Sequence, residues 1–288
     1  MPRFLMLIAA LLFIAVPAHA DDKHFLWRVS KSGDSMYIAG SVHVLRASDY
    51  PLPAVMEQAF SSSAGLVEEI DLADLDPEGM QMDMLKSGGY QDGRTLQSVL
   101  PPDLYQKLMK AAGADGLDMS MLEGLRPWFA SLMLLDAQLA KSGYDPENGA
   151  DMHFAGEATA QHKPVTGLEQ PADQIRILSQ LSDKDQLDLL QQALDESTSF
   201  DDEMQQMIAA WHSGDTGALD KDLTQEFGGY PEVYQTLLVD RNRAWLPKLE
   251  EMLASGKQYF VIVGALHLVG PDGLLQQFKN AGYTVEQL

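Results

Sequence analysis

Two histidines follow apolar segments near opposite ends of this 288-residue chain, and each comes three residues after a glycine. The first segment runs from Met36 to His43, and the second runs from Tyr259 to His267. Neutral imidazole binds divalent transition metals well, and two imidazoles with one or two carboxylates leave positions open for water and substrate. A metal held in this way polarises a carbonyl group and activates water. The paired Gly-x-x-His motifs therefore indicate metal-dependent hydrolysis, although both histidines could instead be structural residues bonded to the backbone.

The acidic residues for such a site come from the segment Leu66–Asp71, which has the composition of a strand. Alternation along a strand predicts Glu68 on one face of the sheet and Glu69 with Asp71 on the other. A carboxylate at the carboxyl end of a strand can face a site. The alternative is that both glutamates lie at an edge of the sheet, in solvent.

The signatures of several other enzyme classes are missing from the sequence. It has no Gly-x-Ser-x-Gly, His-Glu-x-x-His, Walker or Gly-x-Gly-x-x-Gly motif, and it has no cysteine. The sequence therefore gives no motif that supports a serine hydrolase, a zincin or a nucleotide-binding protein. A site built from histidine and carboxylate side chains is the chemistry that remains.

The elements that must position these residues read as an α/β fold. We predict a hairpin over residues 25–38 that leads to the first histidine, and a strand over 258–263 that leads to the second. The chain ends with a helix and a further strand, which favours a central mixed, largely parallel sheet flanked by helices. Ligands gather beyond the carboxyl ends of such strands, so His43 and His267 are expected to converge there. A helical insertion or lid is predicted at roughly residues 73–150.

The first twenty residues read as a signal peptide. Arg3 precedes an apolar run of residues 4–16, and Ala18-His19-Ala20 offers a cleavage site. The run is shorter than the roughly 20 residues that span a bilayer, so we expect a periplasmic or secreted chain of residues 21–288 with no stable membrane anchor. The net charge of −22 disfavours nucleic acid and anionic membranes as partners.

Several motifs together resemble the TraB/GumN family, which is related to the Tiki metalloproteases. The motifs cover nearly the whole predicted mature chain: Gly40-Ser41-Val42-His43, Glu69 in Glu-Ile-Asp, Gly167-Leu168-Glu169 with Gln174, Arg241-Asn242 with Trp245, and Val263 to Gly270 around His267.

The resemblance implies an α/β fold in which His43, Glu69 and His267 hold a divalent metal, with Glu69 rather than Glu68 as the acid. It implies Mn²⁺ or Co²⁺, as in the animal Tiki members, and proteolysis as the activity. Gly40 and Gly264 correspond to the glycines of the two motifs. Glu169 and Arg241 are implied as residues that support the metal ligands or orient the substrate.

Two hypotheses follow. The first is an exported hydrolase, acting as a peptidase, that uses Mn²⁺, Co²⁺ or Zn²⁺, with Glu169 or a neighbouring carboxylate as general base and Arg241 placing a substrate carboxylate or Glu169 itself. The second is a catalytically silent binding module on the same scaffold, which sequesters a peptide, a signalling molecule or a haem-like ligand. Its partner is a peptide or small molecule in either case.

Overall fold

The computed structural model describes residues 23–72, 75–196 and 200–288. The predicted signal peptide, residues 1–20, lies outside the described residues. Within these ranges, no helix combines the length and the hydropathy that crossing a membrane requires.

The described residues form a mixed sheet of six strands in the order β4-β3-β5-β2-β1-β6. The four strands β4, β3, β5 and β2 run parallel to one another, whereas β1 is antiparallel to both β2 and β6. The strand bounds are β1 Leu26–Lys31, β2 Asp34–Ser41, β3 Gly65–Glu68, β4 Val165–Gly167, β5 Tyr259–Gly264 and β6 Thr284–Gln287. This confirms the predicted α/β fold with a mixed, largely parallel sheet.

Strands β2 and β5 lie side by side although more than 200 residues separate them in sequence. Gly40 pairs with Val263, and Ser41 pairs with Gly264. Gly40 is required at this crossing, because a Cβ there would lie 2.4 Å from Phe25 Cδ1 and 3.1 Å from Ala265 Cα. The two histidine segments therefore leave the sheet at the same edge, as the sequence predicts.

One strand prediction needs correction. The strand predicted over Leu66–Asp71 ends at Glu68, and a bend follows at Glu69 and Ile70. The last strand, β6, lies at the sheet edge beside β1 and is antiparallel to it, which fits the predicted mixed sheet. Helix periodicity and strand composition predict the elements here, but they do not predict which strand is the neighbour.

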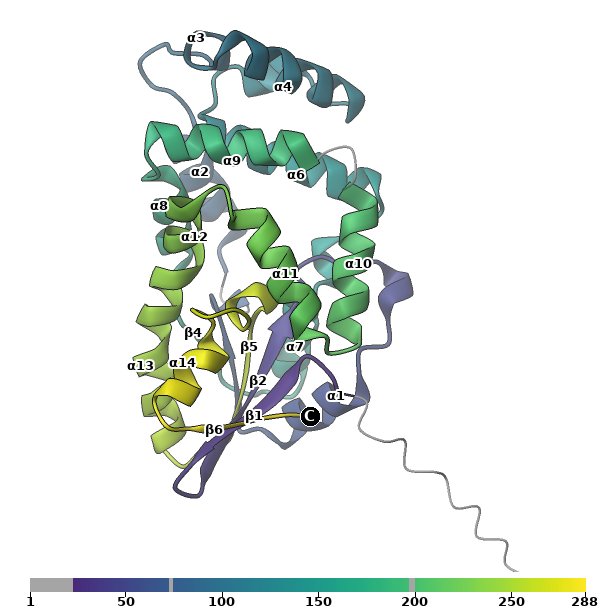
Figure 1. Cartoon of the computed structure of the whole chain (residues 1–288), viewed down its shortest axis with the longest axis vertical. Helices are drawn as coiled ribbons and strands as arrows, with labels where there is room; N and C mark the ends of the chain where they lie inside the picture. The colour runs from purple at the N-terminus through teal and green to yellow at the C-terminus, as the bar shows by residue number, and fades with distance from the viewer. Residues whose placement is uncertain (1–22, 73–74, 197–199) are drawn as a thin grey trace, which may run out of the picture.

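Helices cover both faces of the sheet, with α13 and α14 on one side and α1 and α7 on the other (Figure 1). Their bounds are α1 Ala54–Ser62, α2 Pro77–Gly88, α3 Leu96–Val99, α4 Pro102–Ala114, α5 Met119–Leu122, α6 Pro127–Lys141, α7 Ala150–Ala160, α8 Pro171–Ser179, α9 Asp183–Glu196, α10 Phe200–His212, α11 Thr216–Phe227, α12 Pro231–Tyr234, α13 Asp240–Ala254 and α14 Leu274–Asn280. Short 3₁₀ turns are η1 Ala47–Asp49, η3 Pro146–Asn148 and η5 Ala265–His267, and η4 Gln235–Val239 is a π-helical turn.

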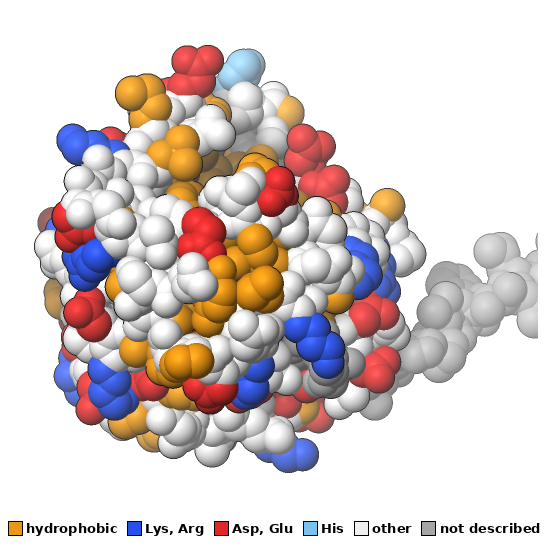
Figure 2. All heavy atoms as spheres, turned by 90° about the horizontal axis from the view of Figure 1, so that it is seen from above, with side chains coloured by type: hydrophobic (Ala, Val, Ile, Leu, Met, Phe, Trp, Pro, Cys, Tyr) orange, Lys and Arg blue, Asp and Glu red, His pale blue; other side chains and the backbone are white. Residues whose placement is uncertain are grey.

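The described residues form two hydrophobic clusters. The larger one surrounds the sheet, and the smaller one is formed by α3, α4, α5, α6 and α9, which lie together at the upper end of Figure 1. Figure 2 looks onto this end and shows hydrophobic side chains gathered near its middle, beside a hollow in the surface. Most of the smaller cluster comes from the predicted insertion, but Leu190 and Leu194 of α9 complete it.

Candidate active site

A pocket of about 560 Å³ opens at the carboxyl ends of β3, β5 and β2. Its polar lining consists of His43, Glu68, Glu69, Asp151, Gln174 and Arg241. Its apolar lining includes Leu132, Met152, Ile177, Leu178 and Leu237, which come from helices α6, α7, α8 and the π-helical turn η4. The polar side chains therefore come from the strand ends and from helices α7, α8 and α13, while helices and turns supply most of the apolar lining.

His43 follows β2 and is held by a carboxylate from α7. Its Nδ1 lies 2.6 Å from Asp151 Oδ2, and its side chain remains 54% exposed to the pocket. Residue 149, just before α7, packs closely against the backbone of His43 and must be glycine. A Cβ at Gly149 would lie 2.4 Å from the His43 carbonyl oxygen. Loss of bulk water around the ring lowers the pKa of His43, but the Asp151 carboxylate outweighs this effect and raises that pKa to about 9.

His267, in η5, is buried, with 4% of its surface exposed, and is fixed in one tautomer by Asn242. The Nδ2 of Asn242 donates to the carbonyl oxygens of His267 and Asp272, each at 3.1 Å, so its Oδ1 faces the ring. That oxygen lies 2.7 Å from His267 Nδ1, which must therefore carry the proton. Burial lowers the pKa of His267 to about 3. The ring is therefore neutral, with a lone pair on Nε2 that points to the site.

Glu69 lies just beyond β3, between the two histidines. Its Oε1 accepts a hydrogen bond of 2.8 Å from the Gly264 N–H, and its Oε2 accepts one from Arg241 Nη2. Burial raises the pKa of Glu69, but the positive charges of Arg241 and His43 and the hydrogen bond from the Gly264 N–H outweigh this and lower that pKa to about 2. Glu69 is therefore a carboxylate at every physiological pH.

Arg241, at the start of α13, links the two predicted acids. Its Nη2 donates to Glu69 and, at 2.5 Å, to Glu169 Oε1, and its Nη1 lies 3.1 Å from His267 Nε2. Glu169 also accepts hydrogen bonds from Gln174 at 3.0 Å and from Trp245 Nε1 at 3.2 Å. Three donors thus engage the carboxylate of Glu169, so in this conformation it orients Arg241 instead of standing free as a base.

The space among the three predicted metal ligands exists because residue 264 is glycine. A Cβ at Gly264 would lie 3.0 Å from His43 Nε2, 3.3 Å from Glu69 Oε1 and 3.5 Å from His267 Cδ2. The Nε2 atoms of the two histidines lie 3.8 and 3.9 Å from Glu69 Oε1. Imidazole nitrogen with carboxylate oxygen is a donor set that suits Zn²⁺, Mn²⁺ and similar divalent ions.

Arg241 competes for this space, because its Nη1 donates to the same His267 lone pair that a metal would use. As the side chains stand, no group of three or more His, Cys, Asp or Glu residues in the described part of the chain could hold a metal ion. The residues fit a divalent metal by donor type and by the shape of the space at Gly264. Binding requires that Arg241 release His267.

Glu68 and Glu69 both line the pocket, contrary to the prediction that strand alternation separates them. The alternation ends with β3 at Glu68, and the pocket lies beyond the strand end, where residues from both faces of the sheet reach it. Glu68 is 1% exposed. Its place in the wall was not predicted from the sequence.

The five predicted site residues all belong to one contact network: His43, Glu69, Glu169, Arg241 and His267. Sequence reasoning missed Asp151 and gave Asn242 no role beyond the family motif. Asp151 stands in the first turn of α7, and a helix start predicts a cap more readily than a partner for a distant histidine. A Gly-x-Asp sequence before a helix is too common to have revealed it.

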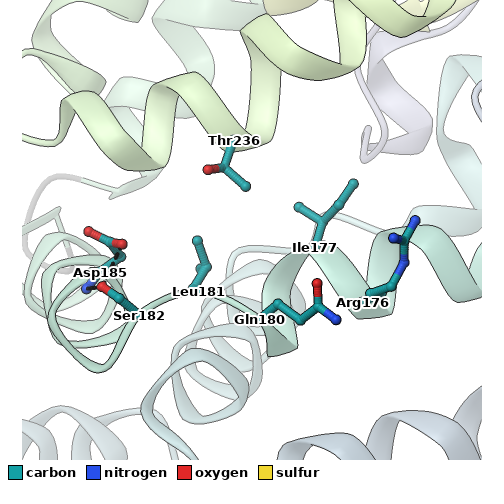
Figure 3. A pocket seen from close by; sticks show the side chains of 7 residues that line it. All are labelled: Arg176, Ile177, Gln180, Leu181, Ser182, Asp185 and Thr236. Atoms are coloured by element: carbon teal, nitrogen blue, oxygen red, sulfur yellow. Dashed lines mark hydrogen bonds between the residues drawn. The ribbon is translucent and has the colours of Figure 1, made fainter.

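A second pocket, of about 280 Å³, lies between α8, the start of α9 and the π-helical turn η4. Figure 3 shows Ile177 and Leu181 pointing toward Thr236 across it. Ile177 lines both pockets, but none of the predicted site residues lines this one. The pocket at the sheet end is therefore the one that carries the candidate chemistry.

Comparison with known proteins places the chain in a family. The sequence model of the TraB/PrgY/gumN family matches residues 25–287. This chain belongs to the TraB/PrgY/gumN family. The match covers every strand of the sheet and every residue of the contact network, so the resemblance predicted from the motifs is confirmed.

Two kinds of relative are similar to this chain. "Uncharacterized protein YbaP" of Escherichia coli (strain K12) is 28% identical, and the match covers 84% of this chain and 87% of YbaP. "Metalloprotease TIKI2" is 24% identical in both Danio rerio and Xenopus tropicalis, and these matches cover 92% of this chain. The chain spans only about 60% of the length of the TIKI2 proteins. No solved structure matches the chain.

Proposed function

We propose that this chain is an exported, divalent-metal-dependent hydrolase that cleaves peptides, with His43, Glu69 and His267 as the metal ligands. The observation that carries the proposal is the open space at Gly264, which these three side chains border. Membership of the TraB/PrgY/gumN family and similarity to proteins named metalloproteases support the same function.

The residues around the ligands prepare them for this role. Asn242 holds the proton of His267 on Nδ1, which leaves Nε2 as a ligand atom. Asp151 orients His43 through its Nδ1, and the Nε2 of His43 becomes a ligand atom once the metal displaces its proton. When bound, a divalent ion supplies Lewis acidity toward the carbonyl oxygen of the substrate. Arg241 keeps Glu69 ionised and directed at the site.

The pocket is suited to a segment of peptide. Its apolar wall, which includes Leu132, Met152 and Leu178, would bury an apolar side chain and exclude water from the bond to be cleaved. The polar groups are confined to the sheet end of the pocket, where the peptide carbonyl would have to lie.

The test uses protein without its first 20 residues, incubated with a mixed peptide library and with Mn²⁺, Co²⁺ or Zn²⁺, and mass spectrometry of the products. We expect metal-dependent cleavage that is lost in His43→Asn and His267→Asn. The control is His162→Asn, because His162 is exposed and Asn accepts its φ of 53°. Cleavage that persists in both site variants, or in chelator, would contradict the proposal.

A second candidate function is a binding module that works without metal. The contact of Arg241 Nη1 with His267 Nε2 favours it, because the side chains of the site already satisfy one another by hydrogen bonds and ion pairs without a metal ion. Metal analysis of the purified protein distinguishes the two. Binding of a peptide or haem in the presence of chelator, unchanged by Glu69→Ala, would favour the binding module.

Export depends on residues 1–20, which lie outside the described part. Fractionation of cells that express the full chain, followed by mass spectrometry of its N-terminus, tests it. We expect an exported protein that begins at Asp21.

A further inference from the structure

Glu68 places a carboxyl group in the wall of the pocket almost without hydrogen bonds. Its only described hydrogen bond is a long one of 3.5 Å, from the Leu72 N–H to Oε2. Its Oε1 is buried and has no partner among the described residues. A buried polar atom without a partner costs free energy, so the fold itself gives no reason for an acid at this position.

The charges around Glu68 are negative. The titratable side chains that act electrostatically on Glu68 are Asp151 and Asp71, and both are acidic. The cationic groups of the pocket are engaged elsewhere: Arg241 contacts Glu69 and Glu169, and His43 contacts Asp151. The Glu68 side of the pocket therefore lacks a cationic group to balance it.

Asp151 adds a second unused acceptor. Its Oδ2 faces His43, but its Oδ1 is buried and has no partner among the described residues. Both residues line the same pocket. Two acceptor oxygens that the fold leaves unused, in one acidic part of a pocket, match a ligand that brings several N–H donors and a positive charge.

We infer that Glu68 binds a protonated amine of the substrate, and that the site prefers peptides carrying such a group beside an apolar side chain. This rests on the proposed function for the peptide nature of the substrate. The α-amino group of a peptide and the ammonium of a lysine side chain share this chemistry. Glu68 is then a specificity-determining residue, which accepts hydrogen bonds from the amine while the apolar wall contacts the neighbouring side chain.

The test measures binding, so that it does not depend on catalysis. Protein without its first 20 residues is mixed with a peptide library in chelator, separated from free peptide by gel filtration, and the retained peptides are identified by mass spectrometry. Three forms of the library are compared: unmodified, acetylated on the α-amino groups only, and acetylated on the lysines only. We expect about tenfold enrichment of amine-bearing peptides over the form that lacks the recognised amine.

The decisive variant is Glu68→Gln, which keeps the shape of the side chain and removes its charge. We expect it to lose the enrichment and to keep or raise the melting temperature, because it removes an acid without a partner. The matched control is Glu57→Gln, whose carboxylate pairs with His153 and does not line the pocket; it should retain the enrichment.

Three outcomes would overturn the inference: equal retention of all libraries by the wild type, no retention of any library, or unchanged enrichment in Glu68→Gln. A fall of the melting temperature by more than about 5 °C in Glu68→Gln would show a structural role and would overturn it as well. Loss of metal-dependent cleavage with intact amine selectivity would instead contradict only the proposed function.

Discussion

The tautomer of His267 depends on a single side chain, Asn242. Asn242 is 2% exposed and makes hydrogen bonds to the His267 ring and to two backbone carbonyl oxygens. We expect Asn242→Ala to lower the free energy of unfolding by roughly 2–4 kcal/mol, because it leaves these buried groups without partners. Urea denaturation measures the change. Asn280→Ala, at the exposed end of α14, should stay within about 0.5 kcal/mol of wild type; equal effects of the two would refute this account of Asn242.

Asp151 sets the protonation of His43. With the Asp151 charge removed in Asp151→Asn, the remaining desolvation lowers the pKa of His43, so we expect it to fall from about 9 to its ordinary value of about 6.5 or below. The pH titration of the imidazole signals by NMR measures this, with the His43 signal assigned by its loss in His43→Asn. A pKa that stays near 9 in Asp151→Asn would show that another group protonates His43.

The residue scale also shows what a sequence can predict of a site. Histidines that follow strands, together with the family motifs, predicted His43, Glu69 and His267, because strand ends place side chains at a defined edge of the sheet. Asp151 and the inward position of Glu68 escaped prediction. Both depend on where a helix start and a strand end lie in space, and neither position leaves a periodic signal in the sequence.

At the scale of elements, the end of β5 keeps the site open. Gly264 has φ −49° and ψ 134°, which any residue can adopt, so Gly264→Ala should change the free energy of unfolding by about 1 kcal/mol or less. Its new Cβ would enter the space between His43 Nε2 and Glu69 Oε1. We therefore expect metal affinity to fall by at least about tenfold while the fold persists. Isothermal titration with Mn²⁺ or Zn²⁺ measures this, and wild-type affinity in the variant would place the metal elsewhere.

The glycine at the end of β2 acts differently. Gly40 packs against the Phe25 ring and the backbone of Ala265, so Gly40→Ala overfills a packed region. We expect a loss of about 1–3 kcal/mol in the free energy of unfolding, measured by urea denaturation. A neutral Gly40→Ala would show that the Phe25 ring moves aside easily.

Helix elements were predicted less completely than strands. An amphipathic helical pattern runs from Glu232 to Leu253 in the sequence, and the structure there contains α12, the π-helical turn η4 and α13. The turn precedes Arg241, whose Nη1 also donates to the Leu237 carbonyl oxygen within that turn. Helical periodicity detects an apolar face, but a single extra residue in a turn changes that pattern too little to be seen.

At the scale of the whole molecule, long-range pairing limits prediction. The adjacency of β2 and β5 followed from two similar strand ends. The smaller hydrophobic cluster, by contrast, joins the predicted insertion to α9, far along the chain. An amphipathic pattern shows that a helix buries one face, but it does not identify the helix that covers it.

The buried site should also shape the pH dependence of stability for the whole molecule. The folded-state pKa of His267 is lowered to about 3, so below pH 6.5 the unfolded chain binds a proton that the folded chain does not. The free energy of unfolding should therefore fall as the pH falls, by about 1.4 kcal/mol per pH unit for this one group. The lowered pKa of Glu69 adds a loss of the same sign below its ordinary value of about 4.5.

His43 changes the free energy of unfolding with pH in the opposite direction, because its folded-state pKa is raised to about 9. Its contribution is complete below pH 6.5 and is lost as the pH rises through 9. Glu68, whose folded-state pKa is raised to about 8, also loses stability as the pH rises from 4.5 to 8, and it offsets His267 below pH 6.5. Stability should therefore be nearly level from pH 4.5 to 6.5 and fall above pH 6.5. Urea denaturation from pH 4.5 to 9.5 measures both ranges, and comparison with variants removes the effect of the overall negative charge. His267→Gln should make stability fall with rising pH from 4.5 to 6.5, because Glu68 is then no longer offset, and His43→Gln should make the fall above pH 6.5 shallower. Slopes that stay unchanged in these variants would mean that other groups govern the pH dependence.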